Sequence, residues 1–255
     1  MKYLPSIEYP EYEIELIERL ANLFKDWHEE AQKKKFISDY SADDMVFDGI
    51  YPYYLNQKKK VLFIGRESLG INGLNYIEVL YHAYKKNHIG DKHINQNKFH
   101  YLMFYIAFGA NNEFPNWDEI PAASEMSATF AQNDGLSFAF MNLSKLSNES
   151  DGWKADWNLI DSFINAFADS SVNYFNKEIS IINPDLIITM NLENRLKVLG
   201  TIEPNDYGSD ISKYDLKVDD KIIPLIDLFH FSAPGKSPKD NYYDIIKKQT
   251  KLFFK

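Results

Sequence analysis

The chain of 255 residues contains no cysteine. Disulfide bonds, thiolate zinc sites and cysteine-ligated iron–sulfur clusters are therefore excluded. Glycine and proline are scarce, with 11 and 10 residues, which argues against a collagenous or disordered chain. No window approaches the roughly 20 apolar residues that span a bilayer, and residues 1–15 lack the apolar segment of a signal peptide. These absences predict an intracellular, cytoplasmic protein with no membrane partner.

Arginine is rare, since only Arg19, Arg66 and Arg195 occur, and the formal net charge is -9. This charge argues against broad non-specific DNA binding, which depends on Lys and Arg neutralising phosphates. The basic residues are unevenly spread, however. Residues 236–255 hold six Lys and two Asp, a local balance of +4, and residues 58–60 are all Lys. These runs indicate either solvated surface or a local edge that faces phosphate.

Hydrophobic residues make up 45% of the chain and aromatic residues 15%, which is enough for one sizeable core. Four segments are short, apolar and rich in β-branched or aromatic residues, a pattern typical of strands buried on both faces of a parallel sheet. They are residues 60–65, 138–143, 186–190 and 222–230.

The intervening segments predict helices by their apolar periodicity. The expected helices are residues 11–33, 99–108, 117–132, 156–179, 193–199 and 240–254. Residues 34–59 are expected to be irregular, and residues 66–98 loop-like with helical pieces. Strands that alternate with helices predict a three-layer α/β/α domain around a mostly parallel, four-stranded sheet. We expect one domain, with a helical extension at 1–59, a core at 60–240 and a terminal helix at 241–255.

Polar side chains follow all four predicted strands, at the edge where open sheets of this kind bind ligands. In strand order they are Arg66, Glu67 and Ser68 after Gly65; Asn142 and Lys145; Asn191; and His230 and Ser232. Taken singly, such a His is more often a structural hydrogen bonder, and such an Asn more often a turn residue. Together, at one edge, they form the candidate site.

The order of these residues, Gly-x-acid, Asn-x-x-Lys and then His-x-Ser, resembles the uracil-DNA glycosylase superfamily. Residues 184–188 (PDLII) also resemble a strand of that superfamily, and the resemblance spans about residues 60–240. It implies a uracil-DNA glycosylase-like fold and hydrolysis of an N-glycosidic bond in DNA, as in base excision repair. The absence of cysteine implies a branch without an iron–sulfur cluster, and the resemblance implies no other cofactor.

The resemblance also implies roles for individual residues. Asn142 corresponds to the residue whose carboxamide reads the base edge, and His230 to the one that stabilises the departing base. Glu67 corresponds to the residue that orients water or supports the sugar cation. The substrate-binding set is completed by Gly65, Arg66, Ser68, Lys145, Ser232 and, as a base-stacking aromatic, Tyr76.

Two of these assignments have alternatives from the residues themselves. Arg66 fits either a phosphate or carboxylate contact or a salt bridge with a nearby acid. Tyr76 is equally well explained as an ordinary core or surface tyrosine.

The sequence departs from the superfamily pattern in three places. Glu67 replaces Asp or Asn and is longer by about 1.5 Å. Ser68 and Phe231 stand where many members have Pro. The loop at 233–239 lacks a large aliphatic wedge. The missing wedge favours single-stranded DNA, a free nucleoside or a nucleotide over duplex DNA.

Two other clusters predict no site. The stretch around residues 82–100 holds four His at spacings that match no helical i, i+4 pair, so we expect no metal. Its members are His82, His88, His93 and His100. Residues 40–48, with Asp43, Asp44 and Asp48, predict a solvated acidic loop.

The leading hypothesis is therefore a hydrolase that removes uracil or a related damaged base. Two alternatives remain: a non-catalytic protein of the same fold that binds a nucleobase or nucleotide, and a hydrolase of the same fold with a different small substrate.

Overall fold

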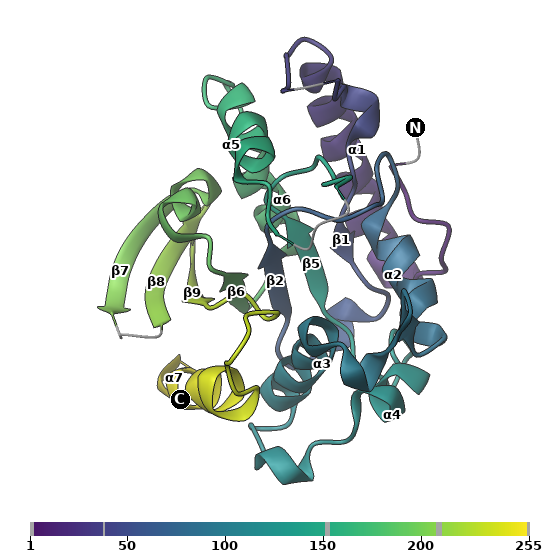
Figure 1. The fold of residues 1–255 in the computed structure, drawn as a ribbon, viewed down its shortest axis with the longest axis vertical. Helices are drawn as coiled ribbons and strands as arrows, with labels where there is room; N and C mark the ends of the chain where they lie inside the picture. Colours follow the sequence, from purple (N-terminus) through teal and green to yellow (C-terminus); the bar gives the residue numbers. More distant parts are fainter. Residues whose placement is uncertain (1–2, 38, 151–153, 208–210, 254–255) are drawn as a thin grey trace.

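The computed structural model describes residues 3–37, 39–150, 154–207 and 211–253. The chain forms an α/β fold around a seven-stranded sheet in the order β1-β5-β2-β6-β9-β8-β7 (Figure 1). The strands are β1 (Gly49–Ile50), β2 (Val61–Gly65), β5 (Ala139–Asn142), β6 (Leu186–Met190), β7 (Thr201–Tyr207), β8 (Ile211–Val218) and β9 (Lys221–Leu228), besides a separate hairpin of β3 (His88–Ile89) and β4 (Lys92–His93). The α/β class is confirmed, and the number of four strands is wrong.

The four predicted strands form the centre of the sheet, as β5, β2, β6 and β9, and run parallel to one another. Every residue of β2, β5 and β6 is buried. Burial on both faces explains why these segments lack a polar–apolar alternation.

The additional strands are antiparallel and lie at the two sides of this parallel centre. β1 pairs with β5, while β8 and β7 continue from β9 as a meander. β7 contains Glu203, Pro204 and Asp206, which are uncommon in strands. Its sequence therefore gives little strand signal, and its conformation depends on pairing with β8.

The helices are α1 (Ile14–Ala31), α2 (Tyr76–Lys85), α3 (Lys98–Asn111), α4 (Ala123–Ala128), α5 (Trp157–Ala166), α6 (Tyr174–Ile182) and α7 (Asp244–Phe253). The single helix predicted at 156–179 is two helices, because Asp156 and Asn173 each cap a separate N-terminus. The helix predicted at 117–132 is α4 with a 3-10 turn before it at Trp117–Glu119. α7 follows a π-helical turn at Lys239–Tyr243, and positions 254–255 of the predicted terminal helix lie outside the described residues.

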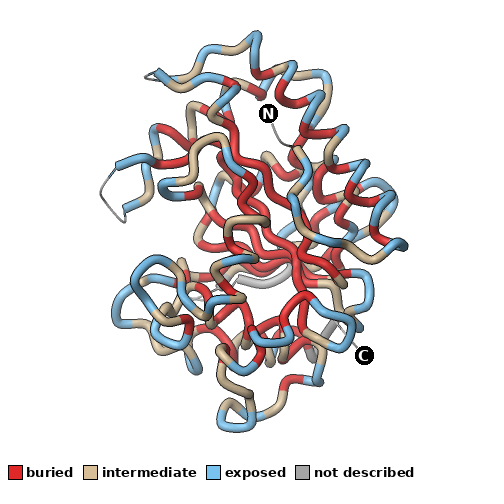
Figure 2. Tube along the Cα trace, turned by 90° about the vertical axis from the view of Figure 1, so that its right-hand side faces the viewer, coloured by how far each residue is buried: buried red, intermediate tan, exposed pale blue. Residues whose placement is uncertain are grey.

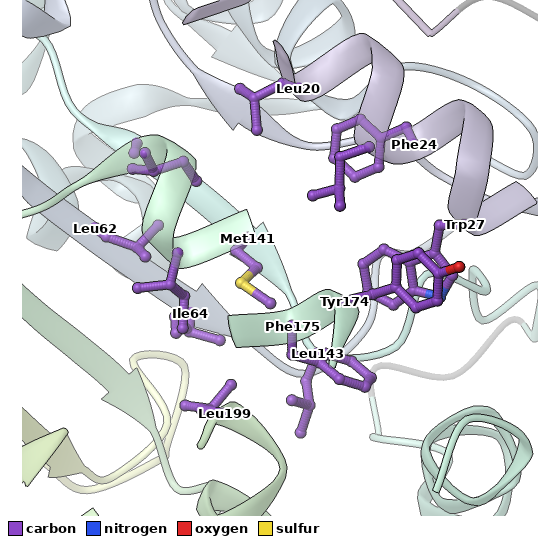
Figure 3. Packing of buried hydrophobic residues seen from close by; sticks show 14 of the residues in the cluster. Leu20, Phe24, Trp27, Leu62, Ile64, Met141, Leu143, Tyr174, Phe175 and Leu199 are labelled. Carbon is purple, nitrogen blue, oxygen red and sulfur yellow. The ribbon is translucent and has the colours of Figure 1, made fainter. Parts of the chain in front are cut away.

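Two hydrophobic clusters cover opposite faces of the sheet, and Figure 2 shows the buried strands between the helical layers. Alternate residues of β2 divide between them: Leu62 and Ile64 face the cluster with α1, α5 and α6, whereas Phe63 faces the one with α2, α3 and α7. In the first cluster, Trp27 of α1 stacks on Tyr174 with ring centroids 5.2 Å apart (Figure 3).

Two classes of feature are not found in the part of the chain that the structure describes. None of its helices combines the length and the apolar character that a membrane span requires. No three or more of its His, Asp and Glu side chains are grouped as metal ligands.

The N-cap of α6 provides a test of local helix stability. Asn173 Oδ1 accepts from the backbone N–H of Asn176 at 3.0 Å, and Asn173 Nδ2 donates to the carbonyl of Val198 at 2.9 Å. We expect Asn173→Ala to lower the free energy of unfolding by about 1 kcal/mol, measured by urea denaturation. Asn173→Ser should retain most of the stability, because serine also caps. Equal losses in both variants would contradict a capping role.

Candidate functional site

The four parallel strands end at one edge of the sheet, where Gly65 of β2 lies beside Asn142 of β5 in register. The side chains that follow these strands therefore lie along one edge of the sheet, with β2 and β6 between the strand that ends at Asn142 and the one before His230.

Asn142 is buried, with 1% of its surface exposed, and its amide group is held by Asp48. The backbone N–H of Asn142 donates to Asp48 Oδ2, and Asn142 Nδ2 donates to Asp48 Oδ1, both at 2.8 Å. These two bonds fix the amide plane. Asp48 lies in the segment predicted to be a solvated acidic loop. This prediction is wrong for Asp48, which is 4% exposed, whereas Asp43 is exposed.

Gly65 lies directly beside the Asn142 amide and the ring of Phe140. A Cβ at position 65 would lie 3.5 Å from Asn142 Oδ1 and 2.8 Å from Phe140 Cζ. The second distance is too short for an ordinary contact, so the Phe140 ring would have to move.

We therefore expect Gly65→Ala to weaken ligand binding at Asn142 and to cost about 1–3 kcal/mol of stability through overpacking. Titration calorimetry and urea denaturation would measure the two effects. Gly90→Ala is a control for a glycine substitution remote from Asn142, since a Cβ there meets nothing within 4 Å, although its positive φ adds strain. Unchanged binding by a folded Gly65→Ala variant would contradict the placement of the ligand.

Four aromatic rings form a row from α2 across the sheet edge to the end of β9, which we call the aromatic row. Tyr76 stacks on Phe140 with centroids 4.5 Å apart, and Phe140 is 6.2 Å from Phe99. The ring of Phe99 is 5.4 Å from that of His230 at an interplanar angle of 32°. Phe99 is partly exposed, whereas Tyr76 is 6% exposed, so Phe99 is the better surface for a stacked base.

His230 carries its proton on Nε2. The backbone N–H of Ser232 donates to His230 Nδ1 at 3.2 Å, so that nitrogen is the acceptor and Nε2 the donor. Burial and the positive charges of Arg66 and Lys98 together lower the pKa of His230 to about 4. The imidazole is therefore a neutral hydrogen-bond donor at neutral pH.

Arg66 lies against an aromatic ring rather than in an ion pair. Its guanidinium is 4.5 Å from the ring centroid of Trp157, and the guanidinium of Arg195 is 4.1 Å from the same centroid. Arg195 is bound bidentately by Asp161 at 2.6 and 2.7 Å. For Arg66, the buried Nε has no hydrogen-bond partner among the described residues. An anionic ligand group would satisfy it.

Glu67 and Ser68 connect the loop after β2 to the chain before α5. Glu67 Oε1 accepts from the backbone N–H of Asp156 at 2.9 Å, and the Ser68 carbonyl accepts from the N–H of Asn148 at 2.8 Å. Burial raises the pKa of Glu67, while the bonds from Asp156 and Asn148 lower it. Glu67 thus contacts this loop, and the structure gives no hydrogen bond from it to Asn142 or His230.

Lys145 does not lie where a ligand could reach it. Its side chain is 0% exposed and forms ion pairs with Asp48 and Glu178, behind Asn142. The assignment of Lys145 to the substrate-binding set is therefore wrong, and Lys145 is a structural residue.

Ser232 is exposed, and its backbone N–H sets the tautomer of His230.

Comparison of the chain with models of known protein families gave no match, and a search of curated proteins gave none either. The site must therefore be interpreted from its geometry.

Two hollows open at the opposite edge of the sheet, before the parallel strands begin. One, of about 690 Å³, is lined by residues that include Arg19, Asn183 and Lys221, and the other, of about 470 Å³, by residues that include Gln57 and Leu136. Neither is lined by Asn142 or His230, so the candidate site is separate from both.

Sequence reasoning missed Asp48, Phe99, Lys98 and Trp157. Asp48 stands alone between apolar Val46, Phe47 and Ile50, and a single acid in an apolar run indicates a buried, paired carboxylate. That signal was available. Phe99 and Trp157 begin helices far along the chain, so only the tertiary structure brings them to this edge.

Proposed function

We propose that this chain is an N-glycosidic bond hydrolase with a uracil-DNA glycosylase-like fold, which removes uracil or a related damaged base from DNA, with single strands favoured. The observation that carries the proposal is the neutral His230, with its Nε2–H free to donate, at the same sheet edge as the fixed carboxamide of Asn142. The strand order β5-β2-β6-β9 at the centre of the sheet supports the fold assignment.

In the proposed reaction, a flipped base enters between Asn142 and the aromatic row. The carboxamide of Asn142 pairs with the polar edge of the base, and Phe99 provides a stacking surface. As the bond between the sugar C1′ and the base nitrogen breaks, its electrons move onto the base. His230 Nε2–H donates to the base oxygen on which negative charge develops. Water then attacks C1′ and gives up one proton to Glu67, and the departed base anion takes up a proton from solvent. Arg66 contacts a phosphate.

A second candidate, binding without cleavage, is favoured by one observation. The carboxylate of Glu67, the residue proposed to handle water, already accepts from the backbone N–H of Asp156 and from Asn148. In this case the same residues would hold a nucleobase or nucleotide without hydrolysing it.

The two candidates are separated by incubating the purified protein with single- and double-stranded oligonucleotides that contain one uracil, and measuring abasic sites. We expect cleavage of the single strand and a rate lowered about ten- to a hundredfold in Asn142→Ala, because a buried partner is lost. Asn112→Ala, on the exposed end of α3, is a control that should keep the wild-type rate.

The outcome distinguishes the hypotheses. Absence of cleavage with nucleobase binding that Asn142→Ala abolishes would replace the hydrolase by the binding protein. Absence of both cleavage and binding would refute both candidates.

A further inference from the structure

A charged cluster, buried on all sides, lies directly behind Asn142. Lys145 Nζ is 2.6 Å from Asp48 Oδ2 and 2.8 Å from Glu178 Oε2, and all three side chains are 0% exposed. The three residues come from different elements: Asp48 precedes β1, Lys145 follows β5, and Glu178 is in α6. We call them the buried triad.

The apolar surroundings of the buried triad impose a large desolvation free energy on its charges. The ammonium of Lys145 lies 5.6 Å from the ring centroid of Phe24 and 5.4 Å from that of Trp27. Charges in such surroundings lose their hydration, and well-packed apolar residues often give equal or greater stability. Stability of the fold alone therefore does not explain why the buried triad is charged. Buried ionic groups can instead favour one conformation over its alternatives.

The charge states within the buried triad are set by burial and by the neighbours. Burial lowers the pKa of Lys145, but Asp48 and Glu178 outweigh it and raise the pKa overall. Burial raises the pKa of Glu178, Lys145 opposes the rise and Asp48 adds to it, and the resulting pKa is about 7. Lys145 is therefore charged at neutral pH, and its ammonium forms an ion pair with the Asp48 carboxylate, 2.6 Å from Oδ2.

An ionised carboxylate can only accept hydrogen bonds, and this property determines the orientation of the Asn142 amide. Asp48 Oδ1 accepts from Asn142 Nδ2 at 2.8 Å. If the amide were flipped, its carbonyl oxygen would face the carboxylate oxygen at this distance, which is repulsive. Nδ2 must therefore point at Asp48, and Oδ1 lies on the side of Gly65, 3.5 Å from the position that a Cβ would take there.

We propose that Asp48, with Lys145 and Glu178 behind it, is a positioning residue that holds the Asn142 carboxamide in one of its two flip orientations and so selects the base edge that the site accepts. The inference rests on the proposed function. Uracil presents an acceptor (O4) next to a donor (N3–H), whereas cytosine presents a donor (N4–H) next to an acceptor (N3). An amide fixed in one orientation matches one order and mismatches the other.

Asp48→Asn tests this selection, because asparagine has the same shape but offers both a donor and an acceptor. Binding is measured with single-stranded oligoadenylates that contain one uracil or one cytosine. We expect wild type to prefer uracil and the ratio of the two affinities to fall at least tenfold in Asp48→Asn. The matched control is Glu13→Gln, because Glu13 is also 0% exposed and accepts from the backbone N–H groups of Tyr53 and Leu55, remote from Asn142. Its ratio should stay at the wild-type value.

A second measurement uses wild type alone and so does not depend on the folding of any variant. The side-chain amide protons of Asn142 are assigned by NMR in the free protein. We expect the proton bonded to Asp48 to be shifted downfield and protected from exchange with solvent. Rapid exchange would overturn the fixed orientation.

The ratio of the two affinities and the exchange of the Asn142 amide protons together distinguish failure of the inference from failure of the proposed function. A folded Asp48→Asn variant that keeps the wild-type ratio overturns the selection role. If wild type binds neither oligonucleotide, the proposed function fails and base selection fails with it, while the exchange measurement still decides whether Asp48 fixes the amide.

Discussion

Replacing Lys145 by methionine is expected to lower the free energy of unfolding by about 3–5 kcal/mol at pH 8, because it leaves two buried carboxylates without their cation. Those carboxylates belong to Asp48 and Glu178 and are 0% exposed. Denaturation in guanidinium chloride measures the loss. Lys34→Met is the matched control, since Lys34, three residues after the end of α1, pairs with the partly exposed Glu30 at 3.0 Å, and this variant should lose much less stability.

The loss in Lys145→Met should also depend on pH through Glu178. A carboxyl whose pKa is higher in the folded state than in the unfolded state stabilises the fold at low pH, and this contribution is lost as pH rises through the folded pKa. In wild type the folded pKa of Glu178 is about 7. Without Lys145 it rises further, so the two proteins should diverge between pH 6 and pH 9. A loss below 1 kcal/mol, or one that is the same at both pH values, would contradict the ion pairing.

The parallel centre of the sheet was predictable from the sequence because its strands are buried on both faces. Segments such as VLFIG at 61–65 and LIITM at 186–190 can remain apolar throughout only in that environment. The antiparallel strands β7 and β8 were missed for the opposite reason. Thr201–Tyr207 is largely polar and contains Pro204, so its strand conformation comes from the meander with β8 and β9 rather than from its composition.

Only the part of the candidate site that lies at the strand ends was predictable from the sequence. Gly65, Asn142 and His230 lie at the ends of predicted strands, and parallel strands place their ends at one edge. The sequence carries no information on which direction a side chain takes after the strand ends. Glu67 therefore contacts the chain before α5, and Lys145 points inward to pair with Asp48 and Glu178, although both belong to the site motifs.

His230→Ala is expected to lower the single-turnover rate of base release by about 10²–10³-fold, which corresponds to the loss of one preorganised donor. The physical reason is the neutral Nε2–H, set by the bond from the Ser232 N–H to His230 Nδ1. His230→Gln should recover part of the rate, because its amide also donates without a charge. Rates are measured with excess protein over a uracil-containing single strand, and an Ala variant within threefold of wild type would remove His230 from the mechanism.

The pH dependence of this reaction provides a sharper test of the same imidazole. Burial and the charges of Arg66 and Lys98 lower the pKa of His230 to about 4. The contribution of His230 should therefore be constant from pH 8 to about pH 5 and change only near pH 4, where protonation at Nδ1 breaks the bond from the Ser232 N–H. Lys98→Met removes one positive charge and should move this acidic limb to higher pH, whereas Lys92→Met, on the β3–β4 hairpin, should not. An acidic limb near pH 6.5 in wild type would mean that His230 is solvated and free of these charges, and the proposed electrophilic role would then lose its structural basis.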